Sequence, residues 1–244
     1  KHAYLIIAHN NFYILERLLK LIDDDRNDIY IHIDKKVKNF DFNYFNNICR
    51  KSTVKFIKRI KVYWGGYSQV QCEYRMMKNN YEYYHLLSGV DLPIKNQDYI
   101  HKFFEKNKGR EFVRFTQNKW DYNRVSKKHF FSNYIKSSNI IESNTYRIAN
   151  KFTSKFINKD DYDYTRKFED YKFMKGDNWF SITDNCAHYI CQNEKAIKTM
   201  FKYTIGPDEH FIQTLLYNSK FKNQLSSDTC LREIDWNRGK PYVY

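Results

Sequence analysis

The chain is short of the residues that build loop-rich or membrane-spanning proteins. Its 244 residues include only 7 Gly and 3 Pro, which argues against a low-complexity or loop-built scaffold. No apolar run approaches the roughly 20 residues that a membrane-spanning helix needs, so no such helix is predicted. The cysteines form no CxxC pair, which argues against a zinc site or a disulfide framework and favours reduced thiols in an intracellular protein. They are Cys49, Cys72, Cys186, Cys191 and Cys230.

Familiar catalytic motifs are absent as well. The chain has no GxxxxGK[ST] loop, no GxGxxG, no GxSxG and no HExxH, which removes most support for ATP-driven, nicotinamide-linked and serine-hydrolase chemistry. Two acidic runs, at 23–25 and 160–163, could suggest metal ligands. Adjacent carboxylates in a loop rarely converge on one ion without further ligands. We therefore expect two solvated loops and no metal site.

Positive charge and aromatic side chains are abundant instead. Lys and Arg number 42 against 28 Asp and Glu, which gives a formal net charge of +14, and 18% of the residues are aromatic. Such a surface favours anionic partners, whether nucleic acid, a phosphorylated substrate or a membrane face. Lys, Asn, Ile, Tyr and Phe are common together, which a bias in composition explains equally well. The charge alone therefore does not choose among these partners.

The amino-terminal half alternates between strand and helix patterns. Residues 4–8 (YLIIA) form a short β-branched apolar run, and residues 12–22 place apolar side chains at helical spacing. Residues 28–34 predict a second strand, so the chain opens with the β-α-β unit that a parallel sheet requires. The remaining predicted elements are a short helix at 42–49, strands at 54–57 and 61–64, a helix at 68–79 capped by Ser68, a strand at 83–88, a helix at 97–106 and a strand at 111–115.

The pattern is less regular in the second half. Residues 116–172 show little periodicity, and we interpret them as an insertion over the sheet, helical in part. The segment 206–209 (GPDE) opens a helix, because Pro and acidic residues suit a first turn. A strand is predicted at 178–183, followed by helices at 185–192 and 194–203.

These elements predict an α/β fold, with a mixed or mostly parallel Rossmann-like sheet flanked by helices. We expect one domain, 1–244. Its parts are an amino-terminal half at 1–115, the insertion at 116–172 and a carboxyl-terminal half at 173–244.

Two acidic positions stand out within this frame. Asp34 ends a predicted strand, where it could bind a ribose or base in a sheet crevice or simply form a turn. Asp208 and Glu209 share a first helical turn, where either can compensate the helix dipole. The same position keeps Glu209 ionised, as a general base must be, although His210 is a competing base.

Basic residues cluster near the carboxyl end of the chain. They form either a solvated face or a group that binds a diphosphate and stabilises its charge as it departs. The residues are Arg232, Arg238 and Lys240.

Read together, several segments resemble one family in the same order along the chain. The chain is similar to the core-2/I-branching β-1,6-N-acetylglucosaminyltransferases and the peptide O-xylosyltransferases, which are inverting glycosyltransferases that use nucleotide sugars. The resemblance covers roughly residues 2–115 and 175–240. The low cysteine content suggests a microbial member of the family. The segments are AYLIIAHNNFYILERLL, IYIHIDKK, VYWGGYSQVQ, YYHLLSGVDLPIK, NWFSIT, the QNEK helix, GPDEHF and LREIDWNRGK.

The resemblance implies a glycosyltransferase A-type fold that works without a DxD motif and without a divalent ion, so no cofactor is expected. It implies that Glu209 is the catalytic base. It also implies that basic side chains stabilise the departing UDP, which suits Arg238 and either Arg232 or Lys240. Five residues are assigned to the donor site by the same resemblance, namely Ala8, His9 and Asp34 near uridine and ribose, Ser68 near the nucleotide, and Asp91.

The acceptor side is less well defined by the resemblance. Candidate residues are Trp120, Arg124, Lys128 and Trp179, whose side chains could stack on or hydrogen-bond to sugars. The expected partners are a UDP-sugar donor and a glycan or lipid-linked glycan acceptor. We expect a cytoplasmic enzyme that builds a surface polysaccharide and that can bind peripherally to the inner face of the plasma membrane. Basic side chains could hold such an enzyme on anionic lipid.

Two other functions compete with this interpretation. A basic nucleic-acid-binding protein would use the aromatic residues as stacking platforms, but these residues fall inside predicted strands and helices, and no nucleic-acid partner is expected. The other is a non-catalytic relative that only binds glycans.

Overall fold

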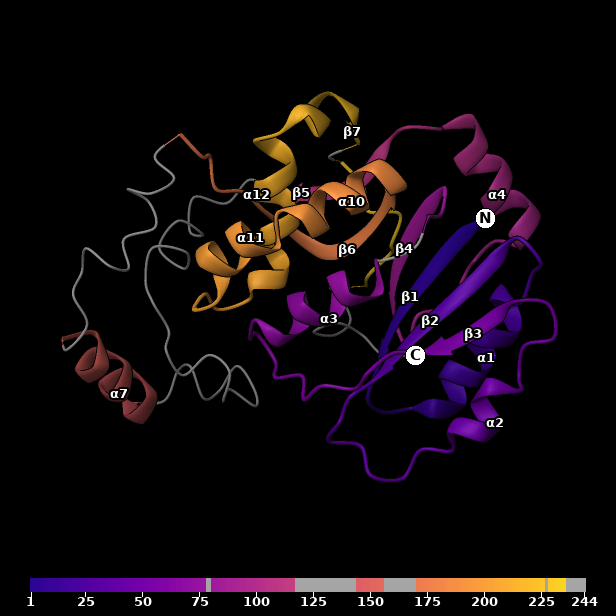
Figure 1. The fold of residues 1–244 in the computed structure, drawn as a ribbon, viewed down its shortest axis with the longest axis horizontal. Helices are drawn as coiled ribbons and strands as arrows, with labels where there is room; N and C mark the ends of the chain where they lie inside the picture. Colours follow the sequence, from indigo (N-terminus) through magenta and orange to yellow (C-terminus); the bar gives the residue numbers. More distant parts are fainter. Residues whose placement is uncertain (78–79, 117–143, 156–169, 227, 236–244) are drawn as a thin grey trace.

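Seven strands form one mixed sheet in the order β3-β2-β1-β4-β6-β5-β7 (Figure 1). The computed structural model describes residues 1–77, 80–116, 144–155, 170–226 and 228–235. The strands are β1 (His2–Ala8), β2 (Asn27–Ile33), β3 (Thr53–Phe56), β4 (Tyr83–Ser88), β5 (Glu111–Thr116), β6 (Lys175–Thr183) and β7 (Leu225–Ser226).

The order of the strands reverses at β1. β3, β2, β1 and β4 are parallel, whereas β6 runs antiparallel to both β4 and β5. From β1 the chain builds β2 and β3 on one side and then returns to place β4 on the other side. Ligands of open α/β sheets bind outside the carboxyl ends of the strands at such a reversal. The predicted α/β fold with a mixed, Rossmann-like sheet is confirmed.

Both faces of the sheet are covered by helices, as the alternation along β1 requires. Ala3 and Leu5 point into one core, which they share with α3, α10, α11 and α12. Tyr4 and Ile6 point into the other core, which they share with α1 and α2 (Figure 1). The helices are α1 (Phe12–Ile22), α2 (Phe42–Asn46), α3 (Ser68–Met76), α10 (Asp184–Gln192), α11 (Glu194–Phe201) and α12 (Phe211–Tyr217).

A third, smaller cluster anchors helix α4 (Gln97–Lys106) to the sheet. Phe104 of α4 packs there against Tyr83 and Phe112 of the strands. Helix α7 (Asn144–Lys155) lies within the stretch that we interpret as an insertion, so that stretch is helical in part, as expected. Among the described residues, no helix is both long enough and apolar enough to cross a bilayer.

Two local predictions are wrong. Residues 61–64 form no strand, because the amide of Tyr63 donates to Ser68 Oγ (2.8 Å) and not to a neighbouring strand. For the same reason Ser68 does not cap α3: it is the first residue of that helix, and its hydroxyl is bonded to Tyr63. Val62 of this segment packs against the core, whereas Trp64 is half exposed.

The region around Pro207 also differs in detail from the prediction. Pro207–Glu209 form a separate 3-10 turn, η3, and α12 begins only at Phe211. A second 3-10 turn, η4 (Lys220–Gln224), and the two-residue strand β7 were not predicted. The other predicted helices and strands are present, with ends shifted by up to three residues.

Candidate functional site

The carboxyl ends of β1, β2 and β4 meet closely at one edge of the sheet. The amide of Gly89, after β4, donates to Ile7 O (2.9 Å), and the amide of Asp34, after β2, donates to Ala8 O (3.0 Å). A Cβ atom on Gly89 would lie 2.5 Å from the Cβ of Ala8, so this approach requires glycine. We call the region around Ala8, Asp34 and Gly89 the carboxyl edge; it brings two of the predicted donor residues together.

Asp34 is held rigidly at the carboxyl edge. Its side chain is buried, and its carboxylate accepts from the amide of Lys36 (2.8 Å), whose Nζ lies 3.3 Å from the other oxygen. The guanidinium of Arg59 donates to the carbonyl oxygens of Ile33 (3.0 Å) and Asp34 (2.7 Å). Arg59 was not predicted, because a single Arg in an irregular segment carries no recognisable pattern.

The other predicted donor residues near this edge differ in exposure. Asp91 closes the turn after β4 by accepting from the amide of Ser88 (2.7 Å), and burial raises the pKa of its carboxyl. Ala8 is buried, so it can offer mainly backbone atoms. His9, the next residue, is exposed.

Two glycine turns far apart in the sequence touch each other beside this edge. The amide of Gly206 donates to Gly65 O (2.9 Å), and the amide of Gly65 donates to Gln69 Oε1 (2.8 Å). Both glycines have positive φ angles, 64° and 65°, which side chains rarely tolerate. The contact joins the start of α3, where Ser68 lies, to η3. It thereby places Glu209 next to the segment that follows β3.

Of the three adjacent candidates for a general base, Glu209 is the accessible one. Its side chain is 42% exposed, and its Oε2 lies 3.4 Å from Nζ of Lys175, the first residue of β6. Asp208 is buried, and burial, with the neighbouring charge of Glu209, raises its pKa to about 7. His210 is buried too, with Nδ1 3.2 Å from the carbonyl oxygen of Met174. Lys175 was not predicted, because the strand was expected to begin only at residue 178.

Arg232 occupies a position between β4 and β6. Its Nη2 donates to the carbonyl oxygens of Leu86 (2.9 Å) and Phe180 (3.1 Å). Its Nη1 lies within hydrogen-bond distance of Cys230 O (3.0 Å) and Ser181 Oγ (3.3 Å). These contacts give Arg232 a structural role in holding two strands together. A diphosphate would have to compete with backbone carbonyls for this guanidinium, which disfavours the role predicted for it.

The remaining predicted site residues are placed as follows. Trp179 lies on β6, half-buried against the core formed with α3 and α10–α12. Five others lie outside the described residues: Trp120, Arg124, Lys128, Arg238 and Lys240.

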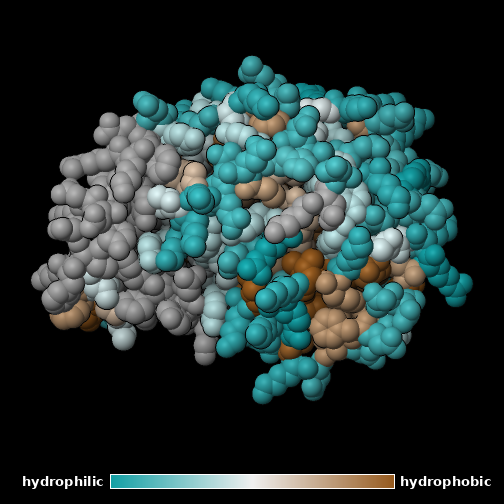
Figure 2. Space-filling model, viewed as in Figure 1, coloured by the Kyte–Doolittle hydropathy of each residue, from teal (hydrophilic) through white to brown (hydrophobic). Residues whose placement is uncertain are grey.

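An open pocket lies between α3 and the segment that follows β3. Its volume is about 350 Å³. Much of the surface in Figure 2 is hydrophilic, with apolar side chains gathered in a recessed area of that face. The pocket lining carries two cationic side chains and one anionic side chain. The lining residues are Ile57, Lys58, Tyr74, Arg75 and Glu194.

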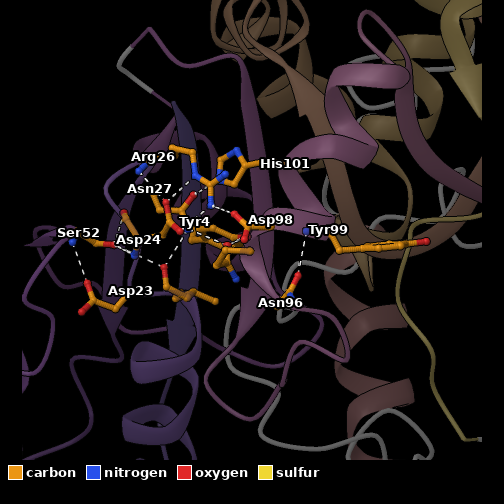
Figure 3. A network of polar contacts seen from close by, with 12 residues as sticks. Tyr4, Asp23, Asp24, Arg26, Asn27, Ser52, Asn96, Asp98, Tyr99 and His101 are labelled. Carbon is orange, nitrogen blue, oxygen red and sulfur yellow. Dashed lines mark hydrogen bonds and ion pairs between the residues drawn. The ribbon is translucent and has the colours of Figure 1, made fainter.

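The opposite, amino-terminal edge of the sheet carries a polar network (Figure 3). Asp24 binds Arg26 through two hydrogen bonds of 2.7 Å, and Arg26 also reaches Asp98 of α4 (2.7 Å). The carboxylate of Asp23 accepts from the amides of residues 50–52. We call this group the amino-edge network. Two carboxylates of the first acidic run thus have protein partners, whereas residues 160–163 lie outside the described residues.

No cluster suited to a metal ion is found in the described part of the chain. No three His, Cys, Asp or Glu side chains there converge so that they could hold an ion. The basic groups at the described site include Lys36 and Arg59 at Asp34 and Lys175 at Glu209.

Comparison with known families agrees with this arrangement. The family model "Core-2/I-Branching enzyme" matches residues 2–242, almost the whole sequence. The chain therefore belongs to the Core-2/I-branching enzyme family. This confirms the resemblance seen in the ordered segments and accords with the glycosyltransferase A-type fold that it implied.

The curated relatives are longer than this chain. Xylosyltransferase 2 of Rattus norvegicus is 24% identical over 250 residues, which cover 97% of this chain and 26% of the relative. Xylosyltransferase 2 of Homo sapiens is 23% identical over 249 residues, with the same coverage. Xylosyltransferase oxt of Drosophila melanogaster is 24% identical and covers 92% and 25%. The chain thus spans about a quarter of the length of the relatives that it matches.

One solved structure was also matched to the chain. The crystal structure of S. aureus TarS 1–349 covers 95% of this chain and 58% of its own, with a TM-score of 0.43 and 10% identity.

Proposed function

We propose that the protein is an inverting glycosyltransferase that moves a sugar from a UDP-sugar to a hydroxyl group of a glycan. The family supports transfer of a sugar, and the sheet reversal supports a nucleotide site at the carboxyl edge. The main structural support for the proposal is the hydrogen bond between Gly206 and Gly65, because it brings the accessible Glu209 towards that edge. A base and a nucleotide site must be neighbours for a sugar to bridge them.

In this proposal Glu209 is the general base. Its carboxylate takes the proton from the acceptor hydroxyl while that oxygen forms a bond to the anomeric carbon. The bond from the anomeric carbon to the diphosphate oxygen breaks at the same time, and its electron pair leaves with UDP. Lys175 keeps the carboxylate oriented through the 3.4 Å contact. Burial of Asp208 and His210 supports Glu209 over both of them.

The donor site would be formed by the carboxyl edge. Asp34, held by Lys36 and Arg59, offers a fixed carboxylate to ribose or uracil. Asp91 closes the turn after β4 at this edge, His9 is exposed next to Ala8, and Ser68 lies at the start of α3. We propose that basic side chains, among them Arg238 and Lys240, neutralise the departing diphosphate in place of a divalent ion.

The proposal extends to the identity of the transferred sugar. The names of the curated relatives favour xylose, and the family description also suits GlcNAc or another hexose. Among the acceptor candidates, Trp179 is the one within the described residues.

We also propose a setting for the reaction. The net charge of +14 suits an enzyme at the inner face of a membrane that acts on a lipid-linked glycan during polysaccharide synthesis. Vesicles with and without anionic lipid test this point: sedimentation with anionic vesicles that salt abolishes is the expected result, and no sedimentation would reject it.

Thermal unfolding with and without UDP tests the proposed function itself. We expect UDP to stabilise the protein, because a ligand that binds only the folded state raises its stability. Stabilisation by UDP without transfer to any glycan would indicate a non-catalytic relative. Salt-sensitive binding of an oligonucleotide without an effect of UDP would instead indicate a nucleic-acid-binding protein.

A further inference from the structure

Two elements that pack against each other, α3 and η3, each carry a buried carboxyl group. Glu73 lies on α3 and is fully buried, and Asp208 of η3 is 6% exposed. Neither carboxyl oxygen of Glu73 has a hydrogen-bond partner in the part of the chain that the structure describes, and Oδ1 of Asp208 has none there either. The two elements are in contact, and the hydrogen bond between Gly206 and Gly65 closes the same junction.

Such an arrangement is costly for ionised groups. A buried carboxylate without a cation or hydrogen-bond donor loses its hydration and gains nothing in return. A protonated carboxyl carries no charge and avoids this cost. Burial raises the pKa of Glu73 well above its usual value, and the neighbouring Asp208 raises it further. Burial and Glu209 raise the pKa of Asp208 to about 7, against hydrogen bonds from the backbone amides of Asp208 and Glu209 that favour its charged form.

The charges around the pair leave this conclusion unchanged. Asp208 is the charged group that acts on Glu73, and Glu209 is the one that acts on Asp208. Lys175 of β6 pairs with Glu209. Arg75 on α3 and Asp34 after β2 act on Cys72, the residue before Glu73. On the other side of η3, Nδ1 of His210 lies against the carbonyl oxygen of Met174.

We propose that Glu73 and Asp208 are positioning residues: a buried carboxyl pair that retains its protons and so allows η3 to pack on α3, with Glu209 as the single negative charge on this turn. The proposal rests on the proposed function only for the role of Glu209. Ionisation of the pair would bring like charges together in a buried contact and move η3 away from α3. Glu209 would move with it, so transfer would weaken as pH rises through the titration of the pair.

Infrared spectroscopy of the carboxyl groups near pH 6 tests the protonation directly. Wild type should show a C=O band of buried protonated carboxyls, and Glu73→Gln and Asp208→Asn should each lose part of it. Glu111, which is buried and has a pKa raised to about 7, contributes its own part and should do so in every variant. Glu105→Gln, at an exposed position of α4, is the matched control and should keep the whole band. A full band in Glu73→Gln would overturn the proposal.

Unfolding as a function of pH gives a second readout that needs no activity. Each proton that only the folded state retains lowers the folding equilibrium constant about tenfold per pH unit between the unfolded and folded pKa values. Glu73→Gln should remove one such contribution and flatten the decline in stability towards neutral pH. An unchanged slope would overturn the protonated pair, even if the variant is less stable throughout.

The positioning role is tested by the pH profile of transfer. Asp208→Asn should keep kcat constant where that of wild type falls on the alkaline side, with KM for the donor unchanged. An alkaline fall identical to that of wild type would reject the positioning role. If wild type transfers no sugar but Glu73→Gln and Asp208→Asn each lose their part of the band, the proposed function fails and the carboxyl pair stands.

Discussion

The two edges of the sheet differ in how far their carboxyl groups are paired with hydrogen-bond donors and cations. At the amino-edge network, Asp23 accepts from backbone amides, and Asp24 and Asp98 share Arg26 (Figure 3). On the side of the carboxyl edge, Glu73 is buried with no hydrogen-bond partner in the part of the chain that the structure describes, Asp208 is buried with its Oδ1 unsatisfied there, and Glu209 remains accessible. Satisfied networks stabilise a fold, whereas unsatisfied buried groups cost free energy. The difference indicates that function is concentrated at the carboxyl edge.

Replacing the proposed base should have the largest effect on activity. Glu209→Gln keeps the shape of the side chain but removes the proton acceptor, so we expect transfer to fall by about 10²-fold or more. Stability and UDP binding should stay close to those of wild type, because Glu209 is partly exposed. Release of UDP in the presence of an acceptor measures transfer. Thermal unfolding with and without UDP measures stability and UDP binding. Near-normal turnover would move the role to Asp208 or His210.

Crowding the carboxyl edge should harm both folding and donor binding. Gly89→Val adds a Cβ atom 2.5 Å from that of Ala8, and overpacking of this kind costs about 1–3 kcal/mol. Chemical denaturation measures the loss of stability. Gly109→Val is the matched control for added bulk, because a Cβ there meets nothing within 4 Å, although its φ of 85° adds local strain. UDP binding should weaken only in Gly89→Val; equal binding by both variants would contradict a donor site at this edge.

Loss of the lysine beside Glu209 should have a smaller effect. Lys175→Met keeps the length of the side chain but removes the 3.4 Å contact, and the less well oriented base should lower kcat about tenfold. Lys175→Arg should restore much of the rate. If both variants have the same rate, the contact does not orient Glu209.

The smallest effect is expected at the amino-edge network. Arg26→Gln breaks a partly exposed ion pair, so the free energy of unfolding should fall by about 1 kcal/mol or less while transfer is unchanged. Hydrogen bonds from Arg26 hold the pKa of Asp24 below 3.8, its usual value. The stability that this carboxylate supplies is therefore present above that value and lost as pH falls, and Arg26→Gln should lose less on acidification. A change in transfer would contradict the separation of the two edges.

Much of the fold could be predicted, because its elements carry strong local patterns. Strand β4 begins and ends where its apolar run does, and α1 spans the predicted 12–22. The segment at 61–64 has the apolar pattern of a strand, but a hydroxyl group, not a neighbouring strand, takes the amide of Tyr63. Local sequence does not reveal which partner a backbone amide finds in the folded chain.

The site was predictable only in part, for a related reason. Asp34 follows directly after an apolar strand, so its place at the sheet edge could be predicted. Lys175 and Arg59 act through contacts with residues distant in the sequence, and nothing near them signals those contacts. For Arg232, the charge suggested a phosphate, whereas in the fold its guanidinium binds carbonyl oxygens of β4 and β6.

The most direct test of the central claim is UDP release from a panel of UDP-sugars, with EDTA present and water as the only acceptor, beside unfolding with UDP. If the carboxyl edge is a donor site that needs no divalent ion, UDP will raise the unfolding temperature and one donor will be hydrolysed slowly in EDTA. If UDP has no effect and no donor is hydrolysed, with or without a divalent ion, the carboxyl edge is not a donor site.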